Sequence, residues 1–122
     1  MATAAFPGVP VEFEARSKLT GEVYRCRFSH LWSAIATRHS DTLDCKFFVN
    51  GRPVIVSLAL TGFVTFRERA GRELSDREAS HIAAAYLKDC LETDGDTDRS
   101  ELTVDQATVI AYTEKLGFLP SM

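Results

Sequence analysis

The chain has 122 residues, of which 45% are hydrophobic and 25% are charged, and its formal net charge is -3. A chain of this size buries a core without disulfides or metal ions, so disordered, collagen-like and disulfide-scaffold proteins are excluded. The weakly acidic charge also argues against a strongly basic nucleic-acid-binding protein. We expect one α+β domain over residues 11–119, preceded by a flexible N-terminal tail over residues 1–10.

The apolar segments and the cysteines favour a cytoplasmic location. The longest apolar run, residues 54–60, is far shorter than the roughly 20 residues of a membrane-spanning helix. The first ten residues lack the basic start and the apolar segment of a secretory signal. Cys26, Cys45 and Cys90 show no paired metal-binding spacing, so we expect buried thiols in a reducing compartment.

The first predicted hairpin turns at residues 20–21, a Thr-Gly pair. A two-residue turn at this point gives one apolar face and one polar face. On the polar face it would place Glu14 opposite Arg27, which is favourable, and Arg16 opposite Arg25, which is unfavourable unless an anion lies between them.

A helix is predicted directly after this hairpin. Ser29 is placed to act as its N-cap, and the helical segment runs from His30 to about His39.

The second predicted hairpin turns at residues 50–51, an Asn-Gly pair, which is the strongest short hairpin signal. A two-residue turn there sets Phe47 opposite Val54 on an apolar face. It sets Phe48 opposite Pro53 on the other face. The turn and the hydrophobic pattern therefore predict the same register.

Three further helices follow from start and stop signals. Gly71 is a helix C-cap signal, and Ser75 and Glu78 have the spacing of a capping box. Thr103 and Gln106 repeat that spacing before the last apolar segment. The predicted helices run from Thr61 to about Ala70, from Ser75 to about Leu91, and from Thr103 to Leu116.

These elements predict a two-layer α+β fold in ββαββααα order. Two hairpins form a four-stranded antiparallel sheet, and the helices pack on its apolar face, because each layer buries its hydrophobic side against the other.

Three aspartates are the candidate cation ligands. Asp94, Asp96 and Asp98 match the first alternating positions of a calcium-binding loop. Arg99 stands where that loop requires glycine, and Asp105 stands where it requires a bidentate glutamate. We therefore expect a solvated acidic loop, no cofactor and no metal.

Charge separates two parts of the chain. Residues 1–77 hold 11 basic and 8 acidic residues, whereas residues 78–122 hold 3 basic and 9 acidic residues. The polar sheet face collects basic side chains beside Phe48, a combination that single-stranded nucleic acid uses for phosphate pairing and stacking. The basic residues are Arg16, Arg25, Arg27 and Lys46.

An apolar cluster on the same face suggests a different partner. Phe48, Pro53 and Ile55 gather at the tip of the second hairpin, where an exposed patch favours dimerisation or docking of another protein. We expect a non-catalytic binding or regulatory module that acts through protein contacts or self-association, without a membrane partner. Nucleic-acid binding and an enzyme whose site is not visible in the sequence are the alternatives.

Overall fold

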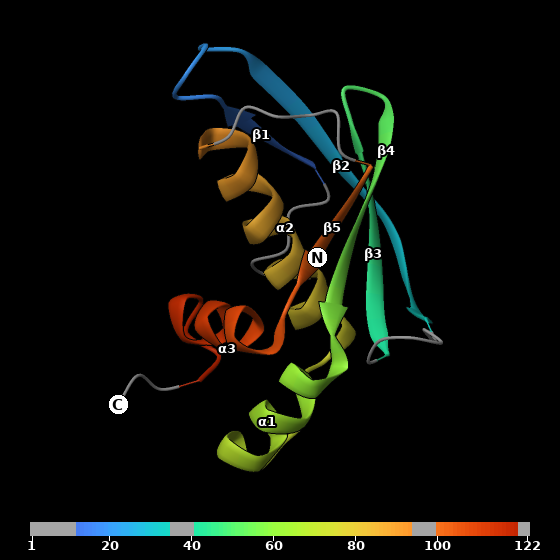
Figure 1. Ribbon diagram of the computed structural model, residues 1–122, viewed down its shortest axis with the longest axis vertical. Coiled ribbons are helices and arrows are strands. Elements are labelled where there is room, and N and C mark those ends of the chain that lie inside the picture. The colour runs from blue at the N-terminus through green and yellow to red at the C-terminus, as the bar shows by residue number, and fades with distance from the viewer. Residues whose placement is uncertain (1–11, 35–40, 94–99, 120–122) are drawn as a thin grey trace, which may run out of the picture.

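The computed structural model describes residues 12–34, 41–93 and 100–119. They form a mixed α+β fold in which a five-stranded sheet has strand order β1-β2-β3-β4-β5. Of the three helices, α2 and α3 lie beside the sheet, and α1 lies beyond the end of β4 (Figure 1). The predicted tail, residues 1–10, is outside the described residues. The elements in chain order are β1 (Glu12–Arg16), β2 (Val23–Ala34), β3 (Thr42–Val49), β4 (Arg52–Ala59), α1 (Leu60–Ala70), α2 (Asp76–Thr93), β5 (Glu101–Val104) and α3 (Gln106–Lys115).

The β3–β4 hairpin confirms its predicted register. Phe47 pairs with Val54 and Phe48 with Pro53. The turn residue Asn50 has φ 51° and the following glycine has φ 83°, as the two-residue turn with two left-handed residues requires. Local turn chemistry is therefore sufficient to set this register.

The β1–β2 hairpin has the predicted faces but a register that differs by two residues. Glu14 pairs with Arg25, and Arg16 pairs with Val23, so the predicted pairing of Arg16 with Arg25 is wrong. The Ser17 hydroxyl accepts the backbone N–H groups of residues 19 and 20, which stabilises a wider loop. A shift by an even number of residues leaves every side chain on its predicted face.

The helix predicted from His30 is wrong in its described part, because β2 continues to Ala34. A β-bulge between Phe28 and His30 shifts the register. Leu31 then lies opposite the buried Cys45. The extended strand pairs along the full length of β3, and this long-range pairing prevails over the local helix signal. Residues 35–39 of the predicted helix lie outside the described residues.

The sheet has a fifth strand that the sequence did not predict. β5 is parallel to β4, and its residues Thr103 and Val104 were expected at the start of a helix. The N-cap of α3 is instead Asp105, whose carboxylate accepts the Thr108 backbone N–H at 2.9 Å. The four-stranded antiparallel sheet and the ββαββααα order are therefore corrected to a five-stranded, mostly antiparallel sheet in ββββααβα order.

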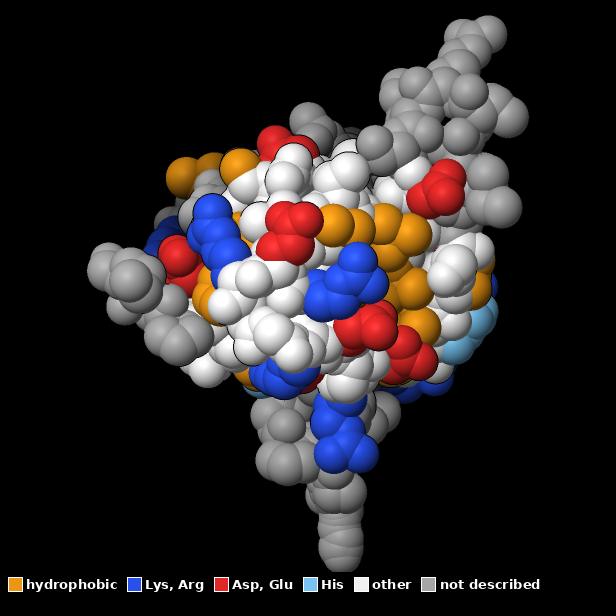
Figure 2. Space-filling view, turned by 90° about the horizontal axis from the view of Figure 1, so that it is seen from below, with side chains coloured by type: hydrophobic (Ala, Val, Ile, Leu, Met, Phe, Trp, Pro, Cys, Tyr) orange, Lys and Arg blue, Asp and Glu red, His pale blue; other side chains and the backbone are white. Residues whose placement is uncertain are grey.

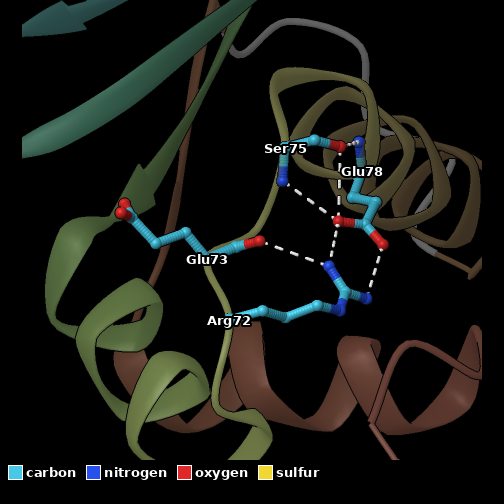
Figure 3. A network of polar contacts seen from close by, with 4 residues as sticks. All are labelled: Arg72, Glu73, Ser75 and Glu78. Atoms are coloured by element: carbon cyan, nitrogen blue, oxygen red, sulfur yellow. Dashed lines mark hydrogen bonds and ion pairs between the residues drawn. The ribbon is translucent and has the colours of Figure 1, made fainter.

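The capping box of α2 is confirmed and is reinforced by an arginine (Figure 3). The Glu78 backbone N–H donates to the Ser75 hydroxyl at 3.1 Å, and the Ser75 backbone N–H donates to the Glu78 carboxylate at 3.0 Å. Both terminal guanidinium nitrogens of Arg72 donate to the same carboxylate, at 2.9 and 2.8 Å. This bidentate hydrogen bonding lowers the pKa of Glu78 and fixes the connection between α1 and α2.

The core lies between the inner sheet face and α2, and a smaller cluster joins α1 to α3. Phe66, Ile110 and Leu119 form that smaller cluster. Beside it, Gly62 allows close helix packing, because a Cβ at this position would lie 2.7 Å from the Val109 Cβ. Within the described residues, no helix has the length and hydropathy needed to span a bilayer.

Candidate binding surface on the outer sheet face

The outer face of the sheet, which is directed away from α2 and α3, carries all the basic and apolar residues that were expected to bind a partner. Buried Ala15, Tyr24, Cys26 and Phe47 point into the core, so their alternate neighbours occupy the outer face. These outer-face candidates are Arg16, Arg25, Arg27, Lys46, Phe48, Pro53 and Ile55.

Two of the basic candidates contact the same aromatic candidate, Phe48. The Arg27 guanidinium carbon lies 4.9 Å from the Phe48 ring centroid, and the Lys46 Nζ lies 5.1 Å from the same centroid. Both distances are within the range of cation–π attraction. The structure thus places two positive charges on one half-buried aromatic ring of a central strand.

The other two arginines have partners other than the Phe48 ring. The Arg25 side chain forms an ion pair with Glu14 at 3.6 Å, and the two side chains are 84% and 62% exposed. Such an exposed pair contributes little to stability. Arg16 donates to the Gly21 carbonyl oxygen at 3.1 Å in the β1–β2 loop, so it lies away from the Phe48 ring.

The apolar candidates continue the surface onto β4. Pro53 is exposed and lies opposite Phe48, whereas Ile55 is half-buried and lies opposite Lys46. The predicted apolar cluster and the predicted basic cluster therefore meet at Phe48 and form one surface.

Two residues of this surface were missed because their segment was predicted to be helical. Trp32 is 37% exposed on the outer face, and its ring centroid lies 5.1 Å from that of His30. His30 is opposite Lys46, and Trp32 is opposite Asp44. The signal that was available is the tryptophan itself, since aromatic residues are enriched in strands.

Five outer-face residues on β2 and β3 form a continuous aromatic–cation stripe. Trp32 lies four residues along the sheet from the Phe48 row, which corresponds to about 13 Å at the rise of a strand. The row of His30 and Lys46 lies midway. The stripe consists of Arg27, His30, Trp32, Lys46 and Phe48.

An open groove of about 670 Å³ adjoins one end of the stripe. Its lining includes Arg25, Arg27 and Phe48 together with the acidic Glu12 and Glu14. Because the groove lies beside the tip of the β3–β4 hairpin, it provides room for a ligand next to the Phe48 ring.

The thiols of the two strand cysteines are not reactive groups of this surface. Cys26 and Cys45 are buried on the inner side of the sheet, and burial raises the pKa of each thiol to about 12. Both thiols are therefore protonated near neutral pH, as expected of small core residues rather than of nucleophiles.

Asp94, Asp96 and Asp98 lie outside the described residues. Over residues 12–34, 41–93 and 100–119, there is no cluster of three or more histidine, cysteine or acidic side chains that could hold a metal ion.

Known protein families, curated proteins and solved structures were all compared with the chain, and none matches it.

Proposed function

We propose that this protein is a non-catalytic binding module that holds its partner on the outer face of the sheet, at the aromatic–cation stripe. The observation that carries the proposal is the convergence of Arg27 and Lys46 on the Phe48 ring, continued along the sheet by Trp32. Tryptophan, arginine and other aromatic residues contribute much of the free energy of binding where they occur at interfaces.

The β-bulge in β2 supports this assignment. Without an extra residue after Phe28, the alternation of the strand would turn His30 towards the core and Leu31 outward. The bulge reverses this, so that His30 and Trp32 share the outer face with Lys46. Bulges are frequent next to functional sites, where they redirect side chains.

The proposal unites the two binding surfaces that the sequence predicts. Pro53 and Ile55 border the stripe on β4, so they extend its apolar part. A partner that covers Phe48 would touch both sets of residues, whichever class of molecule it belongs to.

Site-specific photo-crosslinking in the native cells tests the proposal without knowledge of the partner. A benzophenone amino acid at Ile55 lies opposite Lys46 and leaves all five stripe residues in place. The control carries the same amino acid at Lys88, an exposed position on α2. We expect protein or nucleic-acid adducts from position 55 that position 88 does not give and that Trp32→Ala with Phe48→Ala removes. Identical adducts from both positions would contradict the proposal.

A further inference from the structure

We infer that the partner held by the stripe is a single-stranded nucleic acid. This inference rests on the proposed function and names the ligand class of the same surface. Charge, spacing and the shape of the outer face support it independently.

The charge of the stripe is positive although the chain as a whole is acidic. Among the described residues, Arg27 and Lys46 form no ion pair, and their contact is with the Phe48 ring. Arg27 lies opposite Glu12 in the register, but no salt bridge joins these two side chains. The nearest acid at the other end, Asp44, accepts the Thr42 hydroxyl at 2.7 Å. Two cations are therefore available to an anionic ligand.

The spacing of the stripe matches a repeating ligand. Going along β3, an aromatic row at Phe48 is followed by the cationic row at Lys46 and then by the row of Trp32. Successive rows are about 7 Å apart, because two strand residues separate them. A single strand alternates phosphates with bases that stack on aromatic rings or guanidinium planes. Bases on the two aromatic rows would place a phosphate near Lys46, which lies between them, while Arg27 lies in the Phe48 row.

The shape of the surface favours a single strand over a duplex. Base edges in a duplex are read by a helix or a β-ribbon inserted into a groove. Helices α2 and α3 pack against the opposite face of the sheet, and α1 lies beyond the end of β4 (Figure 1). Stacking on Trp32 or Phe48 also requires bases that are not already stacked on one another.

Charge also favours a nucleic acid over a protein partner. A protein that covered the stripe would remove Arg27 and Lys46 from water, at a cost unless acidic groups met both cations. Every nucleotide carries a phosphate that meets this requirement. A protein partner is therefore the competing outcome of the experiment.

The experiment uses the intrinsic fluorescence of Trp32, which is the only tryptophan of the chain. Labelled single-stranded RNA and DNA of about 12 nucleotides, and the corresponding DNA duplex, are titrated with the protein at about 0.05 M salt. We expect tryptophan quenching and a rise in ligand anisotropy with at least one single strand, weaker binding of the duplex, and weaker binding at higher salt.

A matched pair of charge reversals locates the site. Arg27→Glu with Lys46→Glu is expected to weaken binding about ten-fold or more. The control, Arg67→Glu with Arg69→Glu, replaces two exposed basic residues of α1 and changes the net charge of the protein by the same amount. At the α1 end of the molecule, basic and acidic side chains are interspersed (Figure 2), so we expect the control to bind like the wild type. Circular dichroism verifies that both variants fold.

A second pair of variants separates stacking from charge. Trp32→Ala is expected to reduce affinity several-fold or more by anisotropy, whereas Trp32→Phe retains most of it, because a ring remains for stacking.

Two results would overturn the inference. One is the absence of quenching and anisotropy change with all single strands at about 0.1 mM protein, a concentration at which even weak non-specific binding is detectable. The other is equal loss of binding in the two charge-reversal variants. If protein adducts nevertheless formed from the crosslinker at Ile55, the proposed function would hold with a protein as the partner. If no specific adducts formed either, both the proposed function and the inference would be wrong.

Discussion

The two faces of the sheet are made by the same strands, but their side chains differ in burial and in the contacts that they make. On the inner face, Phe47 is fully buried, with ring contacts to Phe13 and Phe28 at 6.2 and 5.5 Å between centroids. On the outer face, its neighbour Phe48 is only half-buried and contacts two cations. One face is packed for stability, whereas the other leaves contacts available to a partner.

The polar side chains of the helices are also paired where α2 meets α3. Asp89 on α2 accepts the Tyr112 hydroxyl at 2.6 Å and the Lys115 ammonium at 2.8 Å from α3. Although burial raises the pKa of Asp89, these hydrogen bonds outweigh it and hold that pKa below its usual value. The corresponding ionic contact on the outer face, between Arg25 and Glu14, is long and highly exposed. Polar groups thus tie the helices together but leave the outer face adaptable.

The largest expected effect compares adjacent phenylalanines on opposite faces. Phe47→Ala leaves a cavity in the core and is expected to reduce the free energy of unfolding by about 3–5 kcal/mol. Phe48→Ala is expected to reduce it by less than about 1.5 kcal/mol, because this ring is only partly removed from water. Urea unfolding of both variants measures the difference. Equal losses would show that the outer face is packed like the core.

The next effect concerns the contact between α1 and α3. Gly62→Ala places a methyl group against Val109, so it is expected to cost about 1–3 kcal/mol despite the better helix propensity of alanine. Thr61→Ala, at the exposed neighbouring position, is expected to change stability by about 0.5 kcal/mol or less. Thermal unfolding of both variants provides the measurement. A Gly62→Ala midpoint at or above the wild-type value would contradict the close approach.

A smaller effect distinguishes the two capping boxes that the sequence predicts. Ser75→Ala removes a hydroxyl that caps α2 and is expected to cost about 1 kcal/mol. Thr103→Ala is expected to change stability by about 0.5 kcal/mol or less, because Thr103 lies in β5 rather than at a helix start. If Thr103→Ala were the more destabilising change in denaturant unfolding, the assignment of Asp105 as N-cap would be wrong.

The smallest expected effect depends on pH. Burial lowers the pKa of His81, whose ring lies 5.7 Å from that of Phe118. The unfolded chain therefore takes up this proton more readily, and the free energy of unfolding falls as the pH drops below about 6.5. Urea unfolding at about pH 7.5 and about pH 5.5 should show a smaller loss for His81→Gln than for the wild type. If the free energy of unfolding fell equally in both proteins, His81 would not be the cause of the pH dependence.

The elements predicted correctly are those whose signals are local. The Asn-Gly turn sets the β3–β4 register through the positive φ angles of two adjacent residues. Ser75 and Glu78 cap α2 through hydrogen bonds across three residues. The basic and apolar candidates of the outer face could be predicted for the same reason, because strand alternation assigns them to one face.

The errors arise where a distant segment decides the conformation. Ser29 and the residues after it allow either a helix or a strand, and the pairing of β2 with β3 selects the strand. This error concealed His30 and Trp32, which are part of the candidate site. Thr103 has capping-box spacing, but parallel pairing with Ser57 of β4 places it in a strand, and the cap moves to Asp105.

The sequence by itself determined the α+β class, the second hairpin, the cap of α2 and the division of strand residues between two faces, because each depends on neighbours within a few positions. Only the tertiary structure decided the length of β2, the existence of β5 and the alignment of Trp32 with Phe48. The physical reason is that backbone hydrogen bonds of a strand are satisfied by another strand that is remote in sequence.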